Sequence, residues 1–338
     1  MGHRRGTSEP VKIGLVLGAG GLAGLAFHAG TLIALEADLG WDPRDADVIV
    51  GSSAGSIAAA ALRAGVTTDD LAAWASVVAP SAAGRAGRDV LDAMEGQGVG
   101  WSAPRWKLPG PKLLARACRG DLRIASAAMA LLPHGVFDGA RALRQVGALL
   151  PDWPTERLWI TAVRTSDARR VVLGKDVLAS VGDAVAASCA IPALFRPVRI
   201  DGDHYIDGGA HSPTNADVLT SAGVDLAVVL SPMSGAAGER GRSPRHLLRA
   251  MSSRRLQHEC EELERAGIPT HVLEPDAETI GLMGVNALDR ARVPSIVTAS
   301  FLHAGQQIAR DQGLVEALYR PRHLRTLPAH GESVREAS

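Results

Sequence analysis

A serine between two glycines is the feature of this sequence that most directly indicates chemistry. Ser53 is the central residue of the GSSAG segment at 51–55, which follows the apolar run 47–50 and precedes small residues. A serine on a sharp strand-to-helix turn needs its two glycines, Gly51 and Gly55, because side chains there would collide with neighbouring strands. The turn exposes the hydroxyl, and the N–H group after it can face an oxyanion. Ser53 is therefore the predicted nucleophile, and we expect Ser52 to point elsewhere.

A second glycine cluster lies between the first predicted strand and the first predicted helix. Its members are Gly18, Gly20, Gly21 and Gly24. One interpretation is a dinucleotide-binding turn, but that fold expects an acidic residue at the end of the second strand, where this chain has the GSSAG segment. We favour an oxyanion hole made by backbone N–H groups at a helix N-terminus, at Gly20, Gly21 and Leu22.

Asp207 is the candidate general base. It follows the short strand 204–206 and is followed by Gly208 and Gly209, which give close access to its carboxylate. Most Asp-Gly-Gly triplets are only turns. At the end of a strand, however, an aspartate with such access can take the proton of a serine hydroxyl.

The order of the predicted elements is typical of an α/β domain. An apolar strand at 12–17 leads into a long helix ending near Gly40, and a strand at 47–50 leads into a helix at 56–64. Further strands are predicted at 157–163, 170–173, 198–200, 205–206, 224–230 and 270–273, and further helices at 176–188, 243–266 and 293–319. This alternation predicts a mainly parallel central sheet.

The 338 residues suffice for one large α/β domain. We predict a flexible N-terminal tail at 1–10, a single domain at 11–325 and a flexible C-terminal tail at 326–338. The proline-containing segment 80–150, with its short helical stretches, is predicted to be a cap inserted into the core.

Composition excludes several classes of protein. Lys plus Arg (36) equals Asp plus Glu (36), which argues against a protein that binds nucleic acid through its overall charge. The three cysteines have no CxxC spacing, which excludes a disulfide scaffold and a cysteine-rich zinc site; they are expected to be buried in a reducing compartment. The uncharged stretch 13–35 is long enough to span a membrane, but its six glycines favour a buried core helix.

Together, the glycine turn, the GSSAG segment, residues 186–198 and the Asp207 triplet resemble the bacterial patatin-like phospholipases over roughly residues 11–216. The resemblance implies a three-layer α/β/α sandwich and a Ser53–Asp207 dyad that hydrolyses acyl esters of lipids, with neither a catalytic histidine nor a cofactor or metal. The sequence departs from the family pattern at Ala19, where the family usually has glycine, and at Ala23, where it usually has Arg or Lys.

Two alternatives remain open for the activity. An ordinary Ser-His-Asp esterase would need one of the histidines as its base. The histidines considered are His28, His204, His211, His303 and His323. The other alternative is a catalytically silent lipid-binding protein, which Ala19 and Ala23 suggest.

The expected partner is a lipid ester, and no nucleic acid is expected. Residues 100–123 hold six Lys or Arg, one Asp and two Trp, a combination that suits contact with an anionic membrane, although a solvated basic helix is an equal alternative. A second arginine-rich stretch, 240–255, is predicted to be an exposed helix face. We expect a cytoplasmic protein, peripheral to the inner face of a membrane if residues 100–123 bind lipid.

Overall fold

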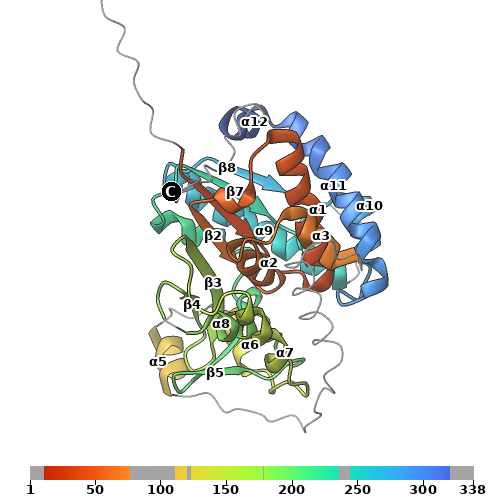
Figure 1. The fold of residues 1–338 in the computed structure, drawn as a ribbon. Coiled ribbons are helices and arrows are strands. Elements are labelled where there is room, and N and C mark those ends of the chain that lie inside the picture. Colours follow the sequence, from red (N-terminus) through yellow and green to blue (C-terminus); the bar gives the residue numbers. More distant parts are fainter. Residues whose placement is uncertain (1–10, 77–110, 120–122, 178, 236–243, 320–338) are drawn as a thin grey trace, which may run out of the picture.

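A mixed sheet forms the centre of the molecule (Figure 1). The computed structural model describes residues 11–76, 111–119, 123–177, 179–235 and 244–319. Within these residues the sheet has eight strands: β1 (Ile13–Leu17), β2 (Val48–Gly51), β3 (Arg157–Arg164), β4 (Arg169–Leu173), β5 (Val198–Ile200), β6 (Asp203–Asp207), β7 (Leu226–Leu230) and β8 (Thr270–Leu273). Their spatial order is β5-β6-β3-β2-β1-β7-β8, with β4 paired to β3 outside this path.

The centre of the sheet is parallel and one end is antiparallel. β1 pairs in parallel with β2 and β7, and the pairs β2–β3 and β7–β8 are also parallel. β4 and β6 run antiparallel to β3, and β5 runs antiparallel to β6. The parallel strands end at the same edge of the sheet, where the glycine turn and the GSSAG segment both begin.

Helices cover the sheet on both faces. The described α-helices are α1 (Gly21–Leu39), α2 (Ala54–Arg63), α3 (Thr68–Ser76), α5 (Pro111–Arg119), α6 (Ile124–Leu131), α7 (Ala140–Arg144), α8 (Val181–Ser188), α9 (Pro244–Arg265), α10 (Ala277–Met283), α11 (Val293–Arg310) and α12 (Gln312–Leu318). Short 3₁₀ helices are η1 (Pro43–Asp45), η2 (Gln145–Ala148), η3 (Gly208–Ala210), η4 (Ala216–Ser221) and η5 (Arg290–Arg292).

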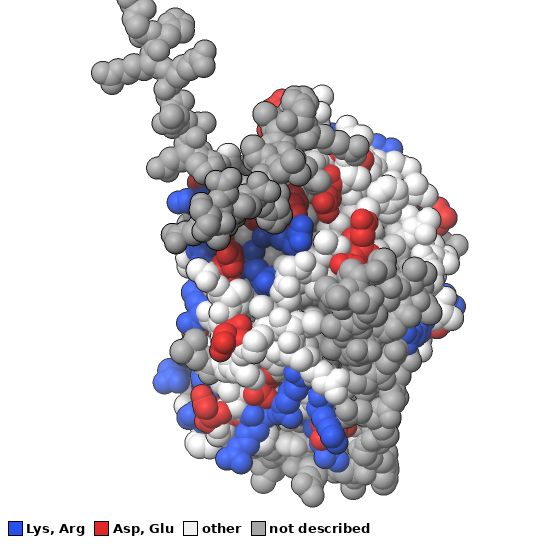
Figure 2. Space-filling view, in the orientation of Figure 1, with Lys and Arg blue, Asp and Glu red and all other residues white. Residues whose placement is uncertain are grey.

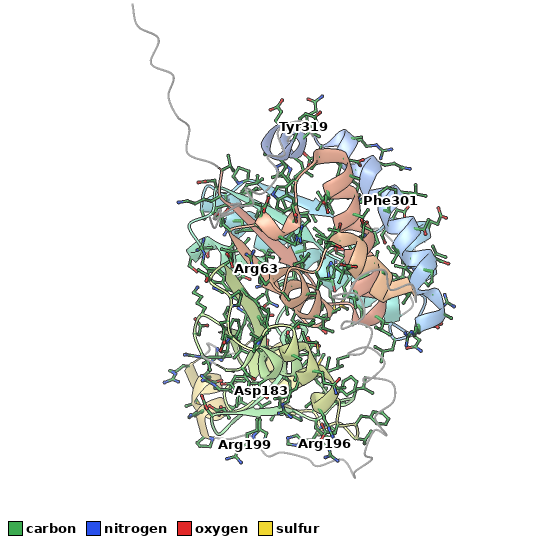
Figure 3. The ribbon with its side chains drawn as sticks, in the orientation of Figure 1. Arg63, Asp183, Arg196, Arg199, Phe301 and Tyr319 are labelled. Carbon is green, nitrogen blue, oxygen red and sulfur yellow. The ribbon has the colours of Figure 1, made fainter. Side chains whose placement is uncertain are left out.

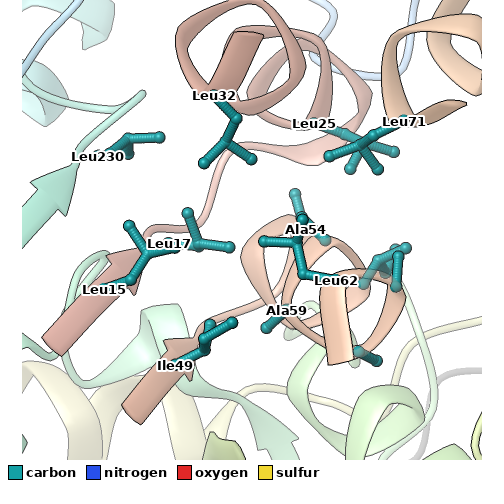
Figure 4. Packing of buried hydrophobic residues seen from close by; sticks show 14 of the residues in the cluster. Leu15, Leu17, Leu25, Leu32, Ile49, Ala54, Ala59, Leu62, Leu71 and Leu230 are labelled. Atoms are coloured by element: carbon teal, nitrogen blue, oxygen red, sulfur yellow. The ribbon is translucent and has the colours of Figure 1, made fainter. Parts of the chain in front are cut away.

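Strand residues alternate between two apolar cores, as the pleat requires. Leu15, Leu17 and Ile49 pack against α1 and α2 on one face, as Figure 4 shows. Val16 belongs to the cluster on the other face, together with residues of η4 and α9 such as Leu263. This arrangement confirms the predicted three-layer α/β/α sandwich.

Helix α1 contains most of the uncharged N-terminal stretch. It is long and apolar enough to cross a membrane, but 72% of its most apolar window is buried inside the protein. Its main partner is α11, which carries Phe301 (Figure 3). A Cβ at Gly30 would lie 2.9 Å from the backbone nitrogen of Phe301, so the close approach of the two helices requires glycine.

Several element boundaries differ from the prediction for local reasons. α8 begins at Val181 because the Ser180 hydroxyl accepts the N–H of Asp183 (3.0 Å) and caps the helix. The helix expected over 293–319 is interrupted at Asp311, whose carboxylate caps α12. α3 and α10 were not predicted.

Two expectations about side chains are wrong. Cys118 on α5 is exposed rather than buried. In the arginine-rich helix α9, Arg255 points inward and its Nε lies 3.0 Å from the buried carboxylate of Glu259, so this stretch is not simply an exposed face. Of the expected cap at 80–150, residues 80–110 and 120–122 lie outside the described residues.

Candidate active site

Ser53 occupies the sharp turn between β2 and α2. Its φ of 52° and ψ of −121° lie in a region that residues with side chains rarely adopt, at a cost on the order of 1–3 kcal/mol. The Ser53 N–H donates to Ser188 Oγ (2.9 Å), and the Ser53 carbonyl accepts from the Ser56 hydroxyl (2.6 Å). A Cβ at Gly55 would collide with the Leu17 carbonyl of β1, so only glycine fits there. These contacts hold the strained turn in place.

Ser52 lies behind this turn. Its side chain is fully buried, and its hydroxyl pairs with the Thr161 hydroxyl of β3 at 2.6 Å. The side-chain nitrogen of Asn215 lies 3.0 Å from the same Ser52 oxygen. The sequence did not identify Asn215 as a site residue because it belongs to no short motif. An asparagine in a loop indicates only that the backbone there can adopt a positive φ.

Asp207 ends β6 directly beside the Ser53 turn. Only 5% of the residue is exposed, and its Oδ1 accepts the N–H of Gly209 at 2.7 Å. Burial raises the pKa of Asp207 to about 6, while hydrogen bonds from the Ser53 hydroxyl and the Gly209 N–H oppose this rise. The two residues predicted to react together thus lie close to each other, and above pH 6 the carboxylate is ionised and able to accept a proton.

The glycine turn contains successive backbone N–H groups that differ in whether they have an acceptor. The N–H of Ala19 donates to the Pro213 carbonyl (2.8 Å), and the N–H of Ala23 donates to the Ala287 carbonyl (3.0 Å). Between them, Gly20, Gly21 and Leu22 have N–H groups for which the described chain supplies no acceptor. They stand at the N-terminus of α1, where an anion is favoured.

Gly21 is required at this turn. Its φ is +61°, and a Cβ there would lie 3.0 Å from the Ala287 carbonyl oxygen. A side chain would therefore push away the loop that follows α10, and with it one wall of the cavity next to Ser53.

An apolar cavity of about 100 Å³ opens beside Ser53. Gly21 and Leu22 of the glycine turn line it together with Ser53. Its apolar walls include Leu25 of α1, Ile57 of α2, Leu143 of α7 and the loop residues Phe195 and Leu288. Cys189 also lines it, but burial raises the pKa of this thiol, which keeps it protonated and unreactive. A mostly apolar pocket beside a serine hydroxyl suits the acyl chain of an ester.

The histidines bond elsewhere. His28 Nε2 lies 2.7 Å from the Gly18 carbonyl, and burial lowers the pKa of His28 to about 4, so the ring is neutral and supports the glycine turn. His211 contacts Arg123 (3.1 Å), and burial together with nearby arginines lowers its pKa to about 3. His303 faces Asp276 (3.4 Å).

Two histidine candidates remain. His204 lies on β6 with its ring centroid 6.0 Å from that of His134. His323 lies outside the described residues. Among the described residues, no group of three or more His, Cys, Asp or Glu side chains could hold a metal ion.

The chain is similar in sequence to a known protein family and in structure to solved proteins. A family model described as patatin-like phospholipase matches residues 15–220, a span that includes the glycine turn, Ser53 and Asp207. Among solved structures, the chain is similar to VipD from Legionella pneumophila, with 16% identity and a TM-score of 0.40, covering 90% of this chain and 68% of VipD. It is also similar to the type III effector ExoU, with 17% identity and a TM-score of 0.35, covering 90% of this chain and 54% of ExoU.

Proposed function

Because the chain belongs to the patatin-like phospholipase family, whose members are lipid acyl hydrolases, we propose that it hydrolyses lipid esters with a Ser53–Asp207 dyad. One observation carries this proposal. Ser53, held in a strained turn, lines an apolar cavity and lies close to the buried carboxylate of Asp207, which has no competing cation in direct contact among the described residues. This is the arrangement that general-base activation of a serine requires.

The reaction follows from these positions. Asp207 takes the proton of Ser53 as Oγ attacks the ester carbonyl carbon, and the N–H groups of Gly20, Gly21 and Leu22 stabilise the resulting oxyanion. Asp207 then returns the proton to the departing alcohol as the ester C–O bond breaks, leaving an acyl-serine. Water attacks this acyl group while Asp207 accepts its proton, and the fatty acid is released as Ser53 regains its hydrogen.

A lipid substrate is supported by the walls and the mouth of the cavity. Leu288 lines the cavity and is 43% exposed, so this apolar wall reaches the surface; Val285, three residues earlier in the same loop, is 91% exposed. We propose that residues 11–325 form one hydrolase domain in which the segment 80–150 caps this pocket. In its described part, Gly139, Ala142 and Leu143 at α7 already form one wall.

We further propose that the protein acts at the cytoplasmic, anionic face of a membrane, using residues 100–123. Residues 100–110 and 120–122 lie outside the described residues, so the support comes from α5. This helix buries Leu113 against the domain and exposes Lys112 and Arg119. Its Arg116 donates to the Asp167 carbonyl (2.7 Å) and fastens the helix to the loop after β3.

Fluorophosphonate labelling followed by mass mapping tests the proposal. We expect one modified residue, Ser53, and no label in Ser53→Ala, which keeps a small side chain at the turn. Modification of Ser52 instead would show that the nucleophile is misassigned. A folded protein that resists the probe and hydrolyses no lipid would support a silent lipid-binding protein.

Charges of both signs occur on the described surface. Figure 2 shows acidic and basic side chains interspersed over the described part of the face in view. At the lower end of the molecule, Figure 3 labels Arg196 and Arg199 near Asp183, which is paired with Arg144. The balance of charge found in the sequence therefore extends to the surface seen in this view.

A further inference from the structure

Asn215 lies at the junction of the two loops that carry Ser53 and Asp207. It is fully buried, adopts φ 56° and ψ 33°, and immediately precedes η4. Its side-chain nitrogen donates to the Ser212 carbonyl (2.6 Å) and lies within hydrogen-bonding distance of Ser52 Oγ (3.0 Å) and the Gly208 carbonyl (3.3 Å).

A hydrogen bond to the amide oxygen fixes the orientation of the Asn215 side chain. Asn215 Oδ1 accepts from a guanidinium nitrogen of Arg170 (3.3 Å), and arginine can only donate. Arg170 in turn is held by two hydrogen bonds to Asp217. The amide nitrogen must therefore face the Ser52 and Gly208 oxygens.

The acceptors of this nitrogen lie in both loops that carry the proposed dyad. Ser52 immediately precedes Ser53, and Gly208 and Ser212 lie in the loop that follows Asp207. The nitrogen has two hydrogens, and its two shortest contacts are the Ser212 carbonyl (2.6 Å) and Ser52 Oγ (3.0 Å). The Thr161 hydroxyl joins the same group, 2.6 Å from Ser52 Oγ and 3.2 Å from the Asn215 nitrogen. One neutral side chain thus spans the base of both loops without adding a charge beside Asp207.

Asn215 is itself anchored to a part of the fold separate from both loops. The buried carboxylate of Glu259 on α9 accepts the Thr214 hydroxyl (2.6 Å) and the Ala216 N–H (2.9 Å), on either side of Asn215. The Ser212 hydroxyl accepts the Asn215 N–H (3.2 Å). Contacts with α9 therefore hold Asn215 in place independently of the loops that its amide binds.

We propose that Asn215 is a positioning residue that sets the separation and orientation of Ser53 and Asp207. Its amide hydrogens bind the Ser212 carbonyl (2.6 Å) and Ser52 Oγ (3.0 Å), and so tie the loop that follows Asp207 to the residue before Ser53. The inference rests on the proposed dyad. If the amide is removed, the loop 208–212 loses its link to Ser52, and the Gly209 N–H in this loop no longer holds Asp207 as firmly. Since that hydrogen bond favours the ionised carboxylate, its loss moves the acid limb of the pH profile to higher pH.

Two substitutions separate the amide from the backbone conformation. Asn215→Gly keeps a residue that adopts positive φ without cost but has no amide, and Asn215→Ala lacks both properties. We expect both to lower kcat for a dissolved short-chain ester by roughly 10- to 100-fold, the scale of a misplaced reacting group. KM should change less than kcat, and the acid limb should shift upward.

Thr214→Val is the matched control. It removes a buried hydrogen bond to Glu259 from the neighbouring residue, so it should lower the unfolding temperature while leaving the acid limb in place. Wild-type kcat and acid limb in Asn215→Gly would overturn the inference, and so would an equal shift of the acid limb in Thr214→Val.

Ser52→Ala tests the positioning role of Asn215 if neither Asn215 variant folds. It removes the acceptor next to the nucleophile, so a smaller fall in kcat with the same upward shift is expected, and an unchanged profile would refute the positioning role. Failure of the wild-type protein to label at Ser53 overturns the proposed function instead. Labelling with an unaffected Asn215→Gly overturns only this inference.

Discussion

Asp207→Asn should make the protein inactive and, at neutral to alkaline pH, more stable. Burial raises the pKa of Asp207 from 3.8 to about 6. Well below pH 3.8 the carboxyl is protonated in both the folded and the unfolded chain, so it contributes no ionisation cost to folding. Between pH 4 and 6 the unfolded chain loses the proton first, so stability falls as pH rises and the full cost is present above pH 6.

The size of this cost follows from the shift. About two pKa units correspond to about 3 kcal/mol of unfolding free energy. Asparagine is neutral at every pH, and its side-chain oxygen can still accept the Gly209 N–H. The stability of Asp207→Asn relative to the wild type should therefore rise by up to about 3 kcal/mol between pH 4 and pH 8. Turnover should fall by about 100-fold or more, since the proton acceptor is lost.

Urea unfolding followed by circular dichroism at a series of pH values measures the first effect, and ester hydrolysis measures the second. Taking the difference between pH 8 and pH 4 cancels any packing cost of the amide itself. Asp201→Asn, at an exposed turn position with a φ of 46°, is the matched control for the substitution. If Asp207→Asn changed stability equally at both pH values, or kept its turnover, the assignment of a buried, ionising base would be wrong.

Other perturbations test separate parts of the site. Ser53→Ala and Ser53→Gly should both lose turnover, but the glycine variant should be more stable by about 1 kcal/mol in urea unfolding because a φ of 52° suits glycine; equal stability would argue against strain. Changing His204, His211 or His303 singly to alanine should leave appreciable hydrolysis, and loss of activity in one of them with an unchanged circular dichroism spectrum would indicate a triad. Lys112→Glu combined with Arg119→Glu should weaken sedimentation with anionic vesicles at low salt, an effect that disappears as salt rises; equal binding to neutral vesicles would contradict the electrostatic contact.

The fold was predictable because its strongest signals are local. The strand at β1 is a continuous apolar run that stops at glycine, and the turn at Ser53 is marked by glycines that its neighbours require for steric reasons. Membership of the family is confirmed by the match over residues 15–220. The roles of Ser53 and Asp207 stay predictions, although the structure brings the two side chains into contact.

The sequence did not predict the features of the site that form where distant parts of the chain pack together. Ile57, Leu143, Phe195 and Leu288 line one cavity, and no spacing along the sequence relates them. Asn215 likewise gains its significance from oxygens on two other loops. The inward orientation of Arg255 is a mixed case. Its partner Glu259 is four residues further along α9, but Asp217, 3.8 Å from the Arg255 guanidinium, comes close only through packing.

The packing of α1 on α11 has a consequence for how this chain is made. Synthesis proceeds from the N-terminus, so α1 emerges long before α11, which lies near the other end of the described chain. Until then the nascent chain carries an apolar helix long enough to span a bilayer, and the face that packs on α11 is exposed. A chain stopped before residue 293 would keep that face exposed, and we expect it to aggregate or to be retained by chaperones. The last long helix thus decides whether the first one becomes part of a folded interior.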